Sequence, residues 1–394
     1  MARRTFSGLL LPPLLAMIAS AQTAPPDRVI DLKASDGIGI KATYFSAEKP
    51  GPGVLLLHQC NRQRKVWDGL ATQLAAAGIN VLTMDLRGFG ESGGTPRDQL
   101  QPRDAARIEA EKWPGDIDTA FDYLVSQPGV DRDVIGVGGA SCGVNNSIQT
   151  ARRHPQAVKS LVLLSGPTDR AGRQFLRQSA QLPALFSFAD DDEFRDTLDI
   201  MPWLFAVDSN PGKRYIHYAK GGHGADMFQL HPELRQAIVD WYVTTLIKTP
   251  GRAPVDHRGW PTSPWPQILA NIDLPGGVEQ AAQKLTKARG RDPKATVFPE
   301  SVVNTLGYEH LQAGDAKGAI GILKLNATAY PHSANVYDSL SDAYLAAGQK
   351  DLARENARKA LDLLASDTTT PEQLRKAIRD SANAKLQQLG AAKP

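Results

Sequence analysis

The chain alternates short, continuously apolar runs with segments whose apolar residues recur every three or four positions. Runs such as residues 54–57 (Val-Leu-Leu-Leu) are typical of strands buried on both faces of a parallel sheet. The pattern predicts strands at 28–35, 38–47, 54–58, 80–86, 133–140, 159–165, 183–189 and 213–219, with helices at 65–77, 116–127, 142–153 and 232–246. This alternation predicts an α/β domain over residues 27–248, with a mostly parallel sheet flanked by helices and functional groups at the carboxyl ends of the strands.

The pattern changes after residue 248. Residues 249–266 contain five prolines and two glycines, which predicts a linker, and we extend this connecting segment to residue 297. Beyond it the chain is helical, and both the pair Gly314 and Gly348 and the pair Ala319 and Ala353 are spaced by 34 residues. A helix–turn–helix period of this length resembles tetratricopeptide repeats, so we expect a small all-α domain at residues 298–390.

The N-terminus has the order of features typical of a secretory signal peptide. Basic Arg3 and Arg4 precede an apolar run at 9–18 and the small residues 19–21 (Ala-Ser-Ala). We therefore predict that residues 1–21 form a signal peptide cleaved after Ala21. The mature protein is expected to be periplasmic or secreted and to have no integral membrane segment.

Charge and cysteine content narrow the classes of partner and cofactor. Lys and Arg number 45 against 42 Asp and Glu, a formal charge of +3. The chain therefore lacks the excess of positive charge that is typical of nucleic-acid-binding proteins. With two cysteines, neither a cysteine-rich zinc module nor a disulfide framework is available. Neither a phosphate-binding glycine loop nor a His-x-x-x-His pair occurs, so we expect no metal and no cofactor.

The segment 134–143 carries the most informative motif. A predicted strand ends in Gly139-Ala140-Ser141-Cys142-Gly143, a Gly-x-Ser-x-Gly sequence, and a predicted helix follows. In this setting the serine lies on a sharp turn, and the helix N-terminus favours negative charge that develops beside it. With this motif, residues 28–248 resemble the α/β-hydrolase family in its compact, dienelactone-hydrolase-like form. The resemblance implies that Ser141 is the nucleophile; a role limited to capping the helix is the alternative.

The resemblance also implies an oxyanion hole. Its donors would be the backbone N–H groups of Cys142, which follows the nucleophile, and Cys60, in the loop after the predicted strand 54–58. Relatives usually have His-Gly where this chain has His58-Gln59, and Gln59 and Arg62 are candidate substrate contacts. Since Cys60 and Cys142 both map to this hole in an exported protein, they are a candidate disulfide pair, with two buried free thiols as the alternative.

The acid and the base are expected after later strands. His223, in the glycine-rich stretch 220–224, follows the predicted strand 213–219, where the resemblance places the base. The acidic run 190–193 follows the strand 183–189, and the relatives' Gly-Glu-x-Asp pattern selects Asp192, with Asp191 as the alternative. His58 is expected to be structural, as is the stretch 85–90 (Asp-Leu-Arg-Gly-Phe-Gly).

Together these features predict an exported serine hydrolase. A Ser141–His223–Asp192 triad would cleave an ester or related acyl bond of a small-molecule substrate through an acyl-enzyme intermediate. Two alternatives stay open. One is a peptidase or amidase on the same fold, and the other is a binding protein whose helical repeats hold a protein or peptide partner while the hydrolase scaffold is idle.

Overall fold

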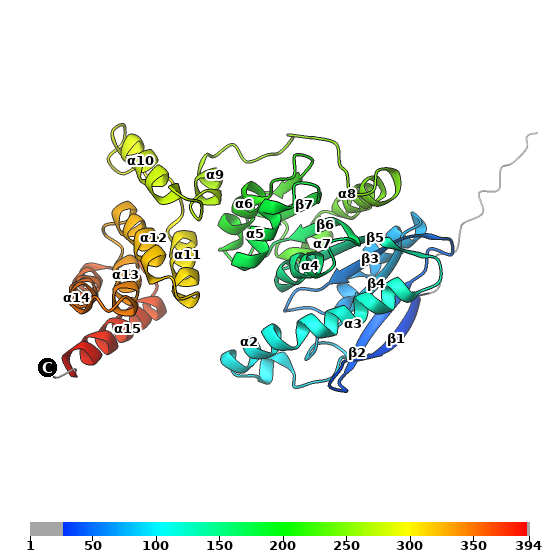
Figure 1. The fold of residues 1–394 in the computed structure, drawn as a ribbon, viewed down its shortest axis with the longest axis horizontal. Helices are drawn as coiled ribbons and strands as arrows, with labels where there is room; N and C mark the ends of the chain where they lie inside the picture. Colours follow the sequence, from blue (N-terminus) through cyan, green and yellow to red (C-terminus); the bar gives the residue numbers. More distant parts are fainter. Residues whose placement is uncertain (1–26, 392–394) are drawn as a thin grey trace, which may run out of the picture.

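A computed structural model describes residues 27–391; the predicted signal peptide lies outside these residues. The first part of the described chain is built on one eight-stranded sheet with the order β1-β2-β4-β3-β5-β6-β7-β8 (Figure 1). Its strands are β1 Asp27–Lys33, β2 Gly39–Phe45, β3 Gly51–Leu57, β4 Asn80–Met84, β5 Val130–Ala140, β6 Val158–Leu164, β7 Ala184–Ala189 and β8 Arg214–Tyr218. Strands β1 and β2 are antiparallel to their neighbours, and β4, β3 and β5 to β8 are parallel. The predicted mostly parallel sheet is therefore confirmed.

Helices cover both faces of the sheet, which is why its central strands are apolar throughout. On one face α3, α4, α5 and α6 bury their apolar residues, and on the other face α1 and α8 do so. The helical segments are η1 Arg64–Trp67, α1 Asp68–Ala76, η2 Arg97–Gln99, α2 Pro102–Glu111, α3 Trp113–Ser126, α4 Cys142–Arg153, α5 Arg170–Gln178, α6 Thr197–Val207, η3 Gly224–Asp226, α7 Met227–Leu230, α8 Glu233–Tyr242 and the π-helical turn η4 Val243–Lys248.

All eight predicted strands are present, and α4 has the predicted bounds. Four α-helices of the α/β part were not predicted by the apolar pattern: α2, α5, α6 and the four-residue α7. Helix α2 buries only Ala105 of its ten residues, so it has no apolar stripe for the pattern to reveal. Helix α6 is apolar on most of its surface and contains Pro202, so a helical period is hard to recognise there as well.

The rest of the described chain is helical, with α9 Trp265–Ala270, α10 Gly277–Arg289, α11 Glu300–Gln312, α12 Ala316–Ala329, α13 Ala334–Ala346, α14 Lys350–Ser366 and α15 Glu372–Ala391. Two of these, α9 and α10, lie within the predicted connecting segment 249–297, and only the first two residues of α9 fall in the proline-rich stretch 249–266. The starts of α11 and α13 are 34 residues apart, as are those of α12 and α14. Gly314 and Gly348 occupy the same place in the two repeats, with φ of 77° and 73°, a conformation that favours glycine. We call α9–α15 the helical module.

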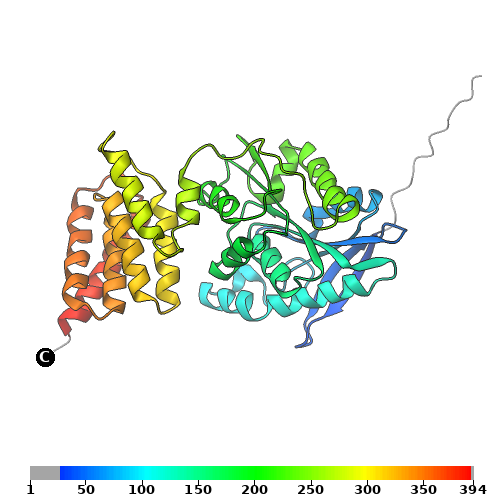
Figure 2. The same cartoon turned by 45° about the horizontal axis from the view of Figure 1, so that its top comes forward.

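The helical module packs against one end of the α/β part (Figures 1 and 2). Trp203 and Leu204 of α6 belong to the same buried apolar cluster as Ile268 and Leu269 of α9. The two parts therefore share a continuous core. Within residues 27–391, no helix is both long enough and apolar enough to cross a bilayer.

Candidate active site

Ser141 lies at the turn between β5 and α4, with φ 53° and ψ −121°. Such a backbone costs a non-glycine residue about 1–3 kcal/mol and is found mainly at functional sites. The turn is so tight that a Cβ on Gly139 would collide with the carbonyl of Gly143, and one on Gly143 with the carbonyl of Leu57. Both glycines of the motif are therefore required by packing, and the serine between them is held half-buried in this strained conformation.

His223 and Asp192 form a buried pair at the carboxyl ends of β8 and β7. The His223 ring is 2% exposed, and its Nδ1 lies 2.8 and 2.9 Å from the two carboxylate oxygens of Asp192. A carboxylate can only accept, so Nδ1 carries a proton, and in the neutral imidazole Nε2 is the unprotonated nitrogen. Nε2 is buried and has no hydrogen-bond partner among the described residues. This imidazole is therefore oriented and has one nitrogen available to take a proton.

The three aspartates of the acidic run have separate partners. Asp191 accepts the N–H groups of Gly222 and Gly221 at 2.8 and 2.7 Å, and these hydrogen bonds hold the pKa of its carboxyl below the usual value. Asp190 lies 2.8 Å from Nε2 of His217. Asp192 is thus the member of the run that contacts His223, while Asp191 shapes the glycine-rich loop before it.

Residues 220–226, which we call the histidine loop, pack directly against the turn at Ser141. A Cβ placed on Gly224 would lie 3.1 Å from Cβ of Ala140, the residue before Ser141. The amide N–H of Ser141 also donates to the carbonyl of Leu164 at the end of β6, at 2.8 Å. The carboxyl ends of β5 to β8 thus bring Ser141, Asp192 and His223 to the same edge of the sheet, as expected for a parallel sheet.

The sequence predicts Gln59 as a substrate contact, but its side chain lies within the protein and binds other loops. It is fully buried, and its Oε1 accepts the N–H of Ala225 at 2.8 Å. Its Nε2 donates to the carbonyl of His223 and to Oδ2 of Asp226, both at 3.3 Å. Both ends of the amide are therefore used to hold the histidine loop. Sequence reasoning missed this role because it depends on a contact between residues more than 160 positions apart.

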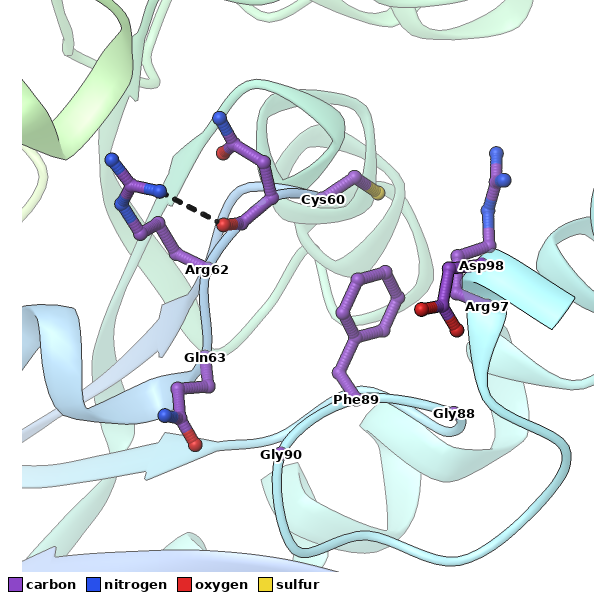
Figure 3. Close-up of a pocket in the computed structure, with 9 residues that line it drawn as sticks. Cys60, Arg62, Gln63, Gly88, Phe89, Gly90, Arg97 and Asp98 are labelled. Carbon is purple, nitrogen blue, oxygen red and sulfur yellow. Dashed lines mark hydrogen bonds between the residues drawn. The ribbon is translucent and has the colours of Figure 1, made fainter.

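Arg62 lies at the surface near the same loop. Its guanidinium binds both oxygens of Asp226, at 3.0 and 2.8 Å, and its side chain is 45% exposed. It also lines a cavity of about 640 Å³ together with Cys60, Phe89 and the segment 97–98 (Figure 3). The position suits a substrate contact, although Asp226 already compensates the positive charge.

A disulfide joins Cys60 and Cys142, whose Cα atoms are 5.8 Å apart. It links the loop after β3 to the first residue of α4. The N–H groups in the first turn of a helix have no partner within the helix, so that of Cys142 can serve an oxyanion. Cys142 lines a second cavity, of about 700 Å³, with Trp113, Asn145 and Thr168 among its lining residues. Each half of the disulfide thus lies beside a cavity large enough for part of a substrate.

The expected structural residues are buried in polar networks. Nε2 of His58 accepts the N–H of Leu86 at 3.0 Å, and burial lowers the pKa of this imidazole. Asp85 is fully buried and pairs with Arg64, which also binds Glu91 at 2.5 Å. These groups fix the loops after β3 and β4.

The sequence analysis did not single out Phe194. Its ring centroid lies 4.5 Å from that of His223, and the residue is 51% exposed. Its N–H donates to Oδ1 of Asp192 at 2.8 Å. An exposed aromatic ring at this place can cover part of a bound substrate, and its position immediately after the acidic run was the available signal. In residues 27–391, no group of three His, Cys, Asp or Glu side chains is arranged to hold a metal ion.

Comparison with known proteins agrees with this architecture. Residues 52–200 match the family model described as alpha/beta hydrolase fold. The thiohydrolase aneE of Aspergillus aculeatus is 29% identical over 123 residues, which cover 31% of this chain and 36% of that protein. An uncharacterized protein of Mycobacterium tuberculosis is 30% identical over 155 residues, covering 39% and 50%. The chain therefore spans half or less of the length of these curated relatives.

Solved structures are more distant in sequence. The dienelactone hydrolase of Anabaena variabilis is 16% identical with a TM-score of 0.45, covering 57% of this chain and 99% of that one. The family-model match, the strand order and the Gly-x-Ser-x-Gly turn between β5 and α4 agree with one another. The α/β part of this chain has the α/β-hydrolase fold.

Proposed function

We propose that the α/β part is a serine hydrolase that cleaves esters or related acyl bonds. The observation that carries this proposal is the buried His223–Asp192 pair, whose free Nε2 belongs to a loop packed against the strained Ser141 turn. A scaffold without turnover has no need for a buried, unpartnered imidazole nitrogen at this place.

In the proposed reaction, Oγ of Ser141 attacks the substrate carbonyl carbon while its proton passes to Nε2 of His223. Asp192 stabilises the imidazolium. The N–H groups of Cys60 and Cys142 donate to the oxyanion of the tetrahedral intermediate. Its collapse breaks the acyl bond, and the leaving group takes the proton from Nε2. Water then attacks the acyl-enzyme by the same route and releases the acid and Ser141.

The relatives named thiohydrolases favour including thioesters among the substrates. For the whole chain we propose export through the N-terminal signal and a tetratricopeptide-like nature of the helical module, supported by its 34-residue period. An oxidising compartment after export is consistent with the Cys60–Cys142 disulfide.

A substrate panel tests the proposal. The purified protein would be assayed with 4-nitrophenyl esters, acyl thioesters and peptide anilides. We expect turnover of esters or thioesters, a loss of about 10⁴-fold or more in kcat/KM in Ser141→Ala, and much slower cleavage of anilides. Faster cleavage of anilides would favour the peptidase alternative. If the folded protein turns over none of these substrates, the binding-protein alternative would replace the proposal.

A further inference from the structure

The segment 165–168 after β6 runs between the nucleophile and the helical module. A Cβ on Gly166 would collide with the backbone carbonyl of Ser141, so the two backbones touch. The N–H of Gly166 points to the sulfur of Met201 in α6, at 3.2 Å. Helix α6 in turn packs on α9, the first helix of the module. The position of this segment therefore affects both the nucleophile turn and the interface.

The same segment forms a wall of the substrate-sized cavity at Cys142. Pro167 and Thr168 line this cavity of about 700 Å³ together with Asn145. The hydroxyl of Thr168 donates to Oδ1 of Asn145 at 2.8 Å, which ties the wall to α4. Any substrate group that enters this cavity from the oxyanion hole meets this wall.

One buried guanidinium connects the wall to the module. Arg173 of α5 is 2% exposed, and its Nη1 donates both to the carbonyl of Thr168 and to Oε1 of Glu309, each at 3.0 Å. Its Nη2 donates to the other carboxylate oxygen of Glu309, in α11. The central carbon of the guanidinium, Cζ, lies 4.4 Å from the centroid of the Trp203 ring. Because a buried guanidinium needs its counter-charge, Glu309 fixes the orientation of Arg173 and hence of the Thr168 carbonyl.

We propose that Glu309 is a positioning residue for the hydrolase site. Through Arg173, the helical module fixes the Pro167–Thr168 wall and thereby sets how the site holds the part of a substrate that extends beyond the scissile bond. This role rests on the proposed function, and it gives the module a task inside its own chain that requires no external partner.

The first test measures the wall directly and does not require activity. Hydrogen exchange of the full chain would be compared for wild type, Glu309→Gln and the control Glu355→Gln. Glu355 is an exposed residue of α14 whose side chain has no hydrogen bond or ion pair within residues 27–391. We expect amides of 165–169 to exchange about tenfold faster in Glu309→Gln, with unchanged exchange in α12–α14 and no effect of the control. Arg173→Lys should give the same result, because a lysine keeps the positive charge but cannot bind both the Thr168 carbonyl and the two oxygens of Glu309 in the same way. Unchanged exchange at 165–169 in both variants would overturn the proposal.

The second test separates positioning from a general loss of structure. Kinetics would compare 4-nitrophenyl acetate with two lengthened esters, 4-nitrophenyl octanoate and octyl acetate. In Glu309→Gln we expect KM to rise about fivefold or more for at least one lengthened ester, while its kcat and the kcat/KM of the acetate stay within about twofold. An equal loss on all three esters would indicate partial unfolding and overturn the proposal. Absence of ester turnover in the wild type would contradict the proposed function, and hydrogen exchange would still decide the role of Glu309.

Discussion

At the scale of single residues, two consecutive side chains of the loop after β3 hold the other two loops of the site. The amide of Gln59 binds the histidine loop at Ala225 and His223, and the next residue, Cys60, is bonded to Cys142 beside Ser141, the proposed nucleophile. The side chain of Gln59 thus fixes the contact between these two loops.

Removing the Gln59 amide should slow catalysis more than it weakens binding. In Gln59→Leu the histidine loop loses three hydrogen bonds, and a misplaced imidazole can reduce kcat by about 100-fold. We expect this loss with little change in KM. Gln156→Leu is the control because Gln156 lies exposed in the loop before β6, outside the lining of both cavities. Equal kcat for the two variants would show that Gln59 does not position His223.

The disulfide is testable on the intact protein. Unfolded, unreduced protein should take up no iodoacetamide, and reduced protein should take up two equivalents, one at each of Cys60 and Cys142. We also expect reduction of the folded protein to lower kcat, because the two oxyanion donors would no longer be fixed relative to each other. Two thiols that react without a reductant, measured by intact mass, would contradict the bond.

At the scale of elements, the sequence predicted the alternation of strands and helices. It did not predict the helices that lack a clear stripe of apolar residues on one face. The apolar runs identified the central strands, because a sheet covered on both faces is apolar there, whereas the edge strand β1 is mostly exposed. The proposed triad could be named from the sequence because its members follow particular strands in the order that the resemblance implies. The roles of Gln59 and Glu309 could not be predicted, since each depends on a partner more than 100 residues away.

The end of α6 supplies a stability prediction. Asp208, just after α6, is buried, and burial raises the pKa of its carboxyl to about 7. The folded state therefore keeps a proton that the unfolded chain loses near its ordinary value of 3.8, so this residue lowers stability as the pH rises from 3.8 to about 7. Between pH 4 and 7.5, the Asp208 carboxyl should lower the free energy of unfolding of the wild type by a few kcal/mol, as an order of magnitude. In Asp208→Asn this contribution should be absent.

Denaturant unfolding at several pH values would measure this effect. The control is Asp362→Asn, an exposed carboxylate of α14, which should follow the wild-type curve. If the free energy of unfolding changes with pH in the same way in the wild type and in Asp208→Asn, the Asp208 carboxyl ionises normally and the prediction is wrong.

At the scale of the whole molecule, one buried apolar cluster runs from the α/β part into the first helices of the helical module, and residues of α12–α15 also form a further cluster. Trp203 and Leu204 of α6 pack in the same cluster as Ile268 and Leu269 of α9. The proline-rich segment predicted a boundary between two parts of the chain. The apolar contact between these parts depends on α6, a helix that the sequence pattern did not predict. The module is thereby positioned to influence the site from behind the 165–168 segment.

The central claim is that Ser141 is an activated nucleophile, and labelling with a fluorophosphonate followed by peptide mapping tests it most directly. We expect one adduct, on Ser141, formed about 100-fold or more slowly in His223→Ala and in Asp192→Asn. Asp191→Asn, the neighbouring carboxylate that binds only backbone, should slow labelling by less than about tenfold. A folded wild-type protein whose Ser141 stays unlabelled, or whose labelling does not depend on His223, would contradict the account.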